Sequence, residues 1–218
     1  MNIYLPADRT GAEVVGFLLL RAAATTKVVT EHAQRRVRDV RWRALRSDTE
    51  NMLVRRCRVA ELSAVQEIDR AAGQMFEQVG RPEVCGMLWH PEPLAACRAE
   101  GRLWVITGAD DRPAGFVITD MVDGCVHVEQ LSVDPGNARR GLGRALLEHA
   151  AEQAAAAGVP ALTLTTFADV PWNAPYYVRC GFRVLEDSEV TAGLRAIRQR
   201  EASFGMDRWP RVCMRRDL

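Results

Sequence analysis

The sequence lacks several features that would assign a protein to a class at once. It has no apolar run of about 18 residues, the length that a transmembrane helix needs. Its six cysteines are scattered and form no C-x-x-C pair, which argues against a zinc site and a small disulfide scaffold. Its net charge is only +1, so no overall charge favours nucleic acid or an anionic membrane. We therefore expect a cytoplasmic protein with reduced thiols and neither a membrane nor a nucleic-acid partner.

The composition suits one medium domain with an extension. Of 218 residues, 48% are hydrophobic and 26% charged, enough to bury a sizeable core. Residues 1–51 differ from the rest, with nine Lys or Arg against six Asp or Glu. We expect 1–51 to be an N-terminal extension, helical or poorly ordered, and 52–218 to be a self-contained domain. The apolar stretch in residues 12–26 is interrupted by Arg21, so we expect no secretory signal.

From Met52 onward, hydrophobic periodicity and turn residues predict alternating strands and helices. An antiparallel meander is followed by a strand–helix–strand crossover, which indicates a mixed sheet flanked by helices, an α/β fold of the α+β type. The predicted strands are 52–58, 102–108, 114–122, 125–133, 161–167, 183–190 and 209–218. The predicted helices are 59–76, 94–101, one ending at Gly158, a short one ending at Gly181, and 192–203.

A glycine- and arginine-rich stretch, DPGNARRGLGRALL (134–147), stands at the start of a strong helix. Bare amides at a helix start suit an anion. A Walker A loop would need Lys and Ser or Thr where Leu142 and Gly143 stand. A Rossmann loop would need a small residue in place of Leu146 and an early β-α-β unit. Neither nucleotide-binding pattern fits.

Residues 128–147, VEQLSVDPGNARRGLGRALL, resemble motif A of the GNAT superfamily of acyl-CoA-dependent N-acyltransferases. That motif is a strand, a Q/R-x-x-G-x-G/A loop and a long helix. Ala138 departs from the pattern at its first position, which weakens the contribution of side chains more than that of backbone amides. The resemblance implies that the amides of residues 139–144 hold the pyrophosphate of coenzyme A. The cofactor-binding residues expected there are Arg139, Arg140, Gly141, Leu142, Gly143, Arg144 and Ala145.

Residues 171–182, PWNAPYYVRCGF, resemble motif B of the same family. The resemblance implies that Tyr177 protonates the leaving thiolate and that Asn173 seats the pantetheine arm. A core aromatic is the alternative for Tyr177. Because helix neighbours point about 100° apart, one of Tyr176 and Tyr177 is expected to be core. The spacing to the Gly-Phe pair at 181–182 favours Tyr177 as the functional one.

The resemblance also implies the GNAT fold, a mixed, mostly antiparallel central sheet of about seven strands flanked by helices. In this family the sheet is splayed between the fourth and fifth strands, here 125–133 and 161–167, and the gap admits the thioester. Backbone groups of Leu131, Ser132 and Val133 are then expected to bind pantetheine. The amide of Leu131 is the expected donor to the developing oxyanion.

The same strand carries the candidates for the general base. Strict alternation would place His127, Glu129 and Leu131 on one face. An alkylammonium acceptor has a pKa of about 10.4 and must lose a proton before it attacks. Relatives place a base at the positions of Glu129 and His127, and we favour Glu129 first and His127 second. The alternative is that Glu129 binds the cationic substrate while an ordered water removes the proton.

The resemblance implies an N-acetyltransferase that moves an acetyl group from acetyl-CoA to a primary amine by direct attack in a ternary complex, with no metal. The acceptor is left open between a small-molecule amine and a protein or peptide amine. Homodimers are frequent in the family, so a homodimer is also left open. The alternative function is a non-catalytic acyl-CoA-binding sensor or scaffold, which would have no need of Tyr177 and Glu129 together.

Overall fold

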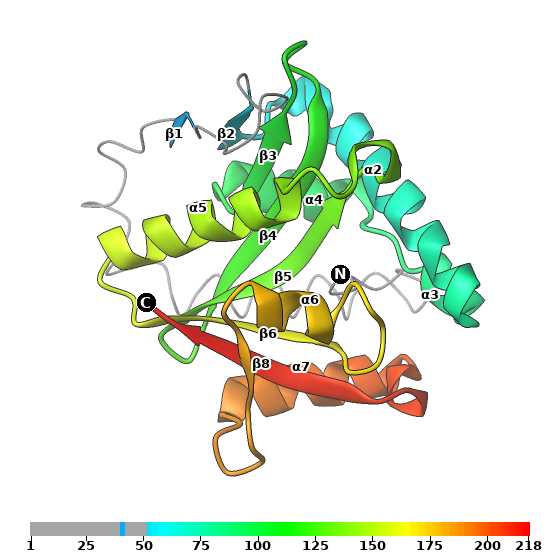
Figure 1. Cartoon of the computed structure of the whole chain (residues 1–218), viewed down its shortest axis with the longest axis vertical. Helices are drawn as coiled ribbons and strands as arrows, with labels where there is room; N and C mark the ends of the chain where they lie inside the picture. The colour runs from blue at the N-terminus through cyan, green and yellow to red at the C-terminus, as the bar shows by residue number, and fades with distance from the viewer. Residues whose placement is uncertain (1–39, 42–51) are drawn as a thin grey trace.

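One mixed sheet of eight strands runs through the described part of the chain, residues 40–41 and 52–218 of a computed structural model (Figure 1). The strand order is β1-β2-β3-β4-β5-β6-β8-β7, and only the β5–β6 pair is parallel. The strands are β1 (Val40–Arg41), β2 (Leu53–Arg56), β3 (Leu103–Thr107), β4 (Pro113–Val122), β5 (Cys125–Val133), β6 (Ala161–Phe167), β7 (Arg183–Val184) and β8 (Arg211–Asp217). The expected mixed, mostly antiparallel sheet is confirmed.

Helices cover both faces of the sheet, with α5 and α6 on one face and α2, α4 and α7 on the other (Figure 1). Their bounds are α2 (Leu62–Gln74), α3 (Pro82–Cys85), α4 (Pro91–Ala99), α5 (Leu142–Ala156), α6 (Ala174–Arg179) and α7 (Ala192–Ser203). The single 3-10 turns are η1 (Val59–Glu61), η2 (Met75–Val79), η3 (Pro135–Asn137) and η4 (Met206–Arg208). Among the described residues, none of these helices has the length and apolarity to cross a membrane.

Two sequence-based boundaries differ from the structure. The predicted strand 183–190 ends at Val184, because the carboxylate of Glu189 accepts the N–H of Glu186 at 3.0 Å and closes a turn there. Within the extension, β1 pairs with β2, so these two residues form a strand where a helix was one expectation. The rest of residues 1–51 lies outside the described residues.

Helix α5 is held against the sheet by an apolar stripe. Leu142, Leu146, Leu147 and Ala154 are all buried in one cluster with residues of β4, β5 and β6. A fully buried leucine contributes about 1.5–3 kcal/mol relative to an exposed one. This packing places the N-terminus of α5 directly after the end of β5.

Strands β5 and β6 pair only at their beginnings. The two pairs are Val126↔Leu162 and His127↔Thr163, after which the strands diverge (Figure 1). Each strand stays paired on its other side, β5 with β4 as far as Val133 and β6 with β8 as far as Phe167. The gap between their carboxyl halves confirms the splay expected between 125–133 and 161–167.

A β-bulge interrupts the alternation of β5 at Glu129. Ile118 pairs with Gln130 and Thr119 with Val128, which leaves Glu129 without a cross-strand partner in the ladder. As a result, Val128 and Leu131 pack in the same α5-side cluster. The prediction that His127, Glu129 and Leu131 share a face is therefore wrong for Leu131, because the extra residue inverts the side-chain direction after it.

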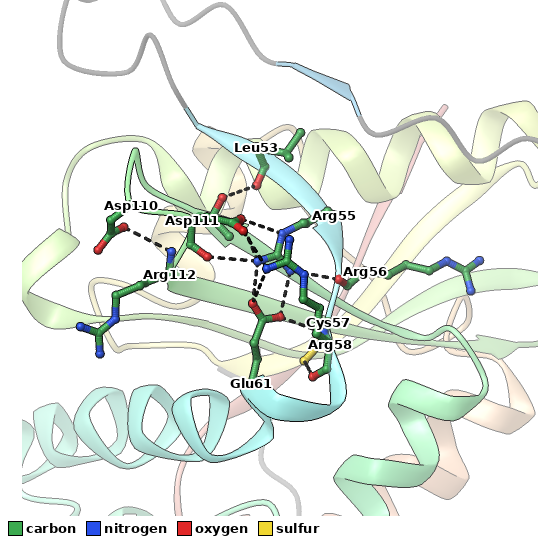
Figure 2. Close-up of polar contacts among 10 residues, drawn as sticks. Leu53, Arg55, Arg56, Cys57, Arg58, Glu61, Asp110, Asp111 and Arg112 are labelled. Atoms are coloured by element: carbon green, nitrogen blue, oxygen red, sulfur yellow. Dashed lines mark hydrogen bonds and ion pairs between the residues drawn. The ribbon is translucent and has the colours of Figure 1, made fainter.

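The outer edge of the sheet is fastened by Arg55, which is only 5% exposed (Figure 2). Its guanidinium donates to both carboxylate oxygens of Glu61 at 2.8 and 2.6 Å and to Oδ1 of Asp111 at 2.9 and 3.0 Å. Burial alone would raise the pKa of Glu61, but the bonds from Arg55 outweigh it and lower that pKa. These contacts join β2, η1 and the β3–β4 turn.

Candidate active site

The turn between β5 and α5 presents a row of backbone donors. Arg139 and Gly141 both have positive φ, 62° and 82°, which curves the chain into a concave loop. Within the described structure, none of the N–H groups of residues 139–144 donates to a backbone carbonyl, and α5 has no side-chain cap at Gly141. Since the helix dipole adds positive potential at this end, the loop can hold an anion.

Gly143 is required by its neighbour on α6. A Cβ built on Gly143 would lie 2.8 Å from the hydroxyl oxygen of Tyr176, closer than real Cβ contacts. The glycine lets the phenol of Tyr176 rest on the first turn of α5. Tyr176 therefore joins α6 to the turn between β5 and α5. Sequence reasoning missed this contact, because it favoured Tyr177 as the functional tyrosine and left Tyr176 for the core.

The other predicted loop residues divide into two groups. Arg139, Arg140 and Arg144 have exposed side chains at the mouth of the loop; Arg140 lies 3.4 Å from Asn137 and Arg144 lies 3.8 Å from Glu148. Leu142 and Ala145 point their side chains into the α5 core instead. These last two residues can contribute only backbone groups to a ligand.

Asn173 is the N-cap residue directly before α6 and is completely buried. Its Nδ2 donates to the hydroxyl of Thr166 at 2.9 Å. Its Oδ1 has no hydrogen-bond partner among the described residues. A buried acceptor without a donor is rare in native proteins, and the amide N–H groups of a pantetheine arm would satisfy it. The residue thus fits the coenzyme that the loop suggests.

Tyr177 lies in the core beside the gap. It is 1% exposed, and its ring packs against Phe182 and Tyr176 at centroid distances of 5.8 and 5.5 Å. Burial raises the pKa of Tyr177, so the phenol stays protonated at neutral pH. The side chain can therefore donate a proton. Its packing is also that of a core aromatic, the alternative role.

The two candidates for the base differ in their surroundings. Nδ1 of His127 lies 3.0 Å from the hydroxyl of Thr163, and burial lowers the pKa of the imidazole, which keeps it neutral. Glu129 stands at the bulge, with its carboxylate 3.6 Å from the guanidinium of Arg200 on α7. Sequence reasoning missed Arg200, because nothing local relates positions so far apart.

A buried ion pair closes the β6–β8 side of the gap. Arg211 donates to Glu201 at 2.6 and 3.0 Å, and the hydroxyl of Thr165 donates to the same carboxylate at 2.5 Å. The guanidinium of Arg211 also stacks 4.6 Å from the ring centroid of Phe167. Burial alone would raise the pKa of Glu201, but the charge and hydrogen bonds of Arg211, the hydrogen bond from Thr165 and the charge of Arg198 together lower that pKa.

Asp69 on α2 is the other group that the sequence did not single out. Its buried carboxylate accepts hydrogen bonds from Gln130, next to the bulge, and from the backbone N–H of Trp89. Ser132, expected among the cofactor-binding residues, turns its hydroxyl toward this carboxylate. Its backbone pairs with Phe116 of β4.

Comparison with known proteins gives relatives for this arrangement. The chain is 35% identical over 94 residues to the [ribosomal protein bS18]-alanine N-acetyltransferase of Salmonella typhimurium, covering 43% of this chain and 64% of the relative. It is 33% identical over 91 residues to the peptidyl-lysine N-acetyltransferase YjaB of Escherichia coli, covering 42% and 56%. The chain therefore spans less than two thirds of either relative's length.

A solved structure shows the same fold. The PaiA N-acetyltransferase from Thermoplasma acidophilum, in complex with coenzyme A, matches with a TM-score of 0.54 and 16% identity over 77% of this chain and 99% of that one. The profile of the Acetyltransferase (GNAT) family matches residues 62–182, more than half of the sequence. The chain therefore belongs to the GNAT acetyltransferase family.

Proposed function

We propose that the protein transfers an acetyl group from acetyl-CoA to a primary amine of a protein or peptide, by direct attack in a ternary complex. The gap between β5 and β6 is the observation that carries this proposal. It gives a thioester access to the backbone of β5, and it opens beside a loop of backbone donors that can hold the pyrophosphate.

Acetyl-CoA would be held along one continuous path. The amides of residues 139–144 take the pyrophosphate, with Arg139, Arg140 and Arg144 around it. The backbone of residues 131–133 pairs with the pantetheine arm, and the unpaired Oδ1 of Asn173 accepts one of its amide N–H groups. Among the described residues, Asn173 Oδ1 has no hydrogen-bond partner and the N–H groups of residues 139–144 donate to no backbone carbonyl, so both are available to a ligand.

The chemistry follows from charge development at the thioester carbonyl. Glu129 takes the proton of the ammonium, directly or through a water, and the free amine attacks the carbonyl carbon. The N–H of Leu131 stabilises the developing oxyanion. The carbon–sulfur bond then breaks, and Tyr177, which is protonated at neutral pH, gives its proton to the departing thiolate. The new amide nitrogen loses its remaining extra proton, which passes through solvent and restores the phenol of Tyr177.

The acceptor class is proposed from the relatives. The two curated relatives are named for an alanine of a ribosomal protein and for peptidyl-lysine, which are both protein amines. We propose a cytoplasmic location on the basis of the six cysteines, which are all free thiols.

The test is thiol release from acetyl-CoA with two peptides, one with a free N-terminal alanine and one blocked at its N-terminus and carrying a single lysine. We expect one peptide to gain an acetyl group by mass spectrometry while coenzyme A is released in equal amount. Coenzyme binding without turnover on either peptide or on small amines would support a sensor instead. Turnover on small amines alone would contradict the acceptor class.

A further inference from the structure

The buried carboxylate of Asp69 faces β5, the strand that carries Glu129 and Leu131. It is 2% exposed, and no Lys, Arg or His among residues 52–218 forms an ion pair with it. Its oxygens accept the N–H of Trp89 at 3.1 Å, Nε2 of Gln130 at 2.9 Å and the hydroxyl of Ser132 at 3.4 Å. Burial raises its pKa to about 6, although these three donors oppose the rise.

Packing alone does not account for this residue. The same side of α2 is otherwise apolar, with Val65, Ile68 and Ala72 buried. Replacing a buried ionic group by a well-packed apolar one is often neutral or stabilising. A buried carboxylate that forms no ion pair with residues 52–218 therefore costs folding free energy at a position that a leucine could fill.

Gln130 gives a second, independent observation. Its Nε2 donates both to Asp69 and to Ser132, each at 2.9 Å, while its Oε1 is buried with no partner among the described residues. An unsatisfied buried acceptor costs about 1–3 kcal/mol. The side-chain NH2 group of Gln130 is thus directed at Asp69, while Oε1 of the same amide has no hydrogen bond to any described residue.

The position of these bonds on β5 indicates their role. Gln130 and Ser132 are the two neighbours of Leu131, and all three follow the bulge at Glu129. A bulge disrupts the ladder locally and leaves the strand less constrained. Side-chain bonds on both sides of Leu131 therefore hold the segment that lines the gap.

Asp69 also connects this segment to the chain between α3 and α4. Helix α2 holds both polar groups of the Trp89 backbone, since Asp69 accepts its N–H and Gln66 donates to its carbonyl at 3.1 Å. Gln66 lies one helical turn before Asp69 and, within residues 52–218, forms no hydrogen bond to β5. This difference supplies a matched control.

We propose that Asp69 is a positioning residue that holds the backbone at Leu131 in the geometry needed for acetyl transfer, acting through Gln130 and Ser132. The proposal rests on the proposed function, because it assigns Leu131 to the reacting carbonyl. Asp69 lies outside both sequence motifs, so the proposal adds a further residue that acts on the same site.

The first test is Asp69→Asn, which offers one acceptor oxygen in place of two. With the peptide that the wild type acetylates, we expect kcat to fall about ten- to a hundred-fold while the Kd for coenzyme A changes less than about threefold. Gln130→Met keeps the length of the side chain and removes its amide, and we expect kcat to fall in the same direction. Gln66→Ala should lower Tm but leave kcat within about twofold.

Hydrogen exchange supplies a readout that needs no turnover. In Asp69→Asn and Gln130→Met, the peptide covering residues 129–133 should exchange about tenfold faster or more, whereas Gln66→Ala should leave it unchanged. If both variants lower only Tm, with kcat and exchange at residues 129–133 as in the wild type, Asp69 is merely structural and the proposal is wrong. If Asp69→Asn does not fold, Gln130→Met decides.

The two proposals fail in different ways. A wild-type protein that acetylates neither peptide contradicts the proposed function, and the exchange experiment still tests whether Asp69 holds β5. A wild-type protein that acetylates a peptide, with unchanged kcat in Gln130→Met and Asp69→Asn, contradicts only the role of Asp69.

Discussion

Buried polar groups are paired differently at the outer edge of the sheet and beside the gap between β5 and β6. At the edge, the buried Arg55 is paired with two carboxylates, so its charge is balanced (Figure 2). On the β5 and α6 sides of the gap, Asp69 forms no ion pair with a residue of 52–218, and Asn173 and Gln130 each keep an unpaired buried oxygen among the described residues. Balanced groups serve the fold, whereas unbalanced ones indicate a ligand or a reaction.

The largest effect is expected for Tyr177→Phe, on the side of the gap. Removing the hydroxyl should lower kcat by about ten- to a thousand-fold, because the thiolate loses its proton donor, while the Kd for coenzyme A stays nearly unchanged. Steady-state thiol release and calorimetry measure the two quantities. Unchanged turnover would return Tyr177 to the role of a core aromatic and weaken the contrast between the two regions.

Arg55→Met tests the other region of the comparison, the outer edge of the sheet. The variant removes the cation that lies closest to Glu61 and leaves only Arg58, at 3.7 Å, so we expect a loss of about 2–3 kcal/mol in the free energy of unfolding in urea, with kcat nearly unaltered. Arg58→Met is the matched control, because Arg58 is largely exposed and its pair with Asp111 should contribute less than about 1 kcal/mol. A large fall in kcat for Arg55→Met would show that the edge also serves the reaction.

The burial of the Asp69 carboxylate predicts a pH dependence of stability. The pKa of Asp69 is raised by burial from 3.8 to about 6, so its contribution to stability is fully present only below 3.8 and is lost as pH rises through about 6. Relative to Asp69→Asn, the wild type should lose about 2 kcal/mol between about pH 4.5 and about pH 7.5. Urea unfolding of both proteins checks this. A pH-independent difference would mean that a cation balances the carboxylate.

The smallest effect is expected at the turn between β5 and α5. Gly143→Ala favours the helix by propensity, yet its Cβ would meet the hydroxyl of Tyr176 at 2.8 Å. We expect coenzyme A to bind about five- to tenfold more weakly as the first turn of α5 shifts. Tyr176→Phe in the same chain removes that oxygen and leaves the nearest ring atom at 3.6 Å, so it should restore binding. Failure of this rescue would place the strain elsewhere.

Much of the fold could be predicted because its signals are local. The strands 125–133 and 161–167 and the helix 192–203 have the predicted bounds, since periodicity and turn residues define them without reference to partners. The bulge at Glu129 could not be predicted. Alternation assumes one partner for each residue, and only the pairing with β4 shows the extra one.

By itself, the sequence determined the order of the elements and the glycine-containing turn before α5. Only the tertiary structure decided which side of the sheet Leu131 faces and which distant groups meet. Gln130 and Asp69 are 61 positions apart, and Arg55 and Asp111 are 56 apart. A local pattern encodes whether a side chain is buried, but the packing of whole elements selects its partner.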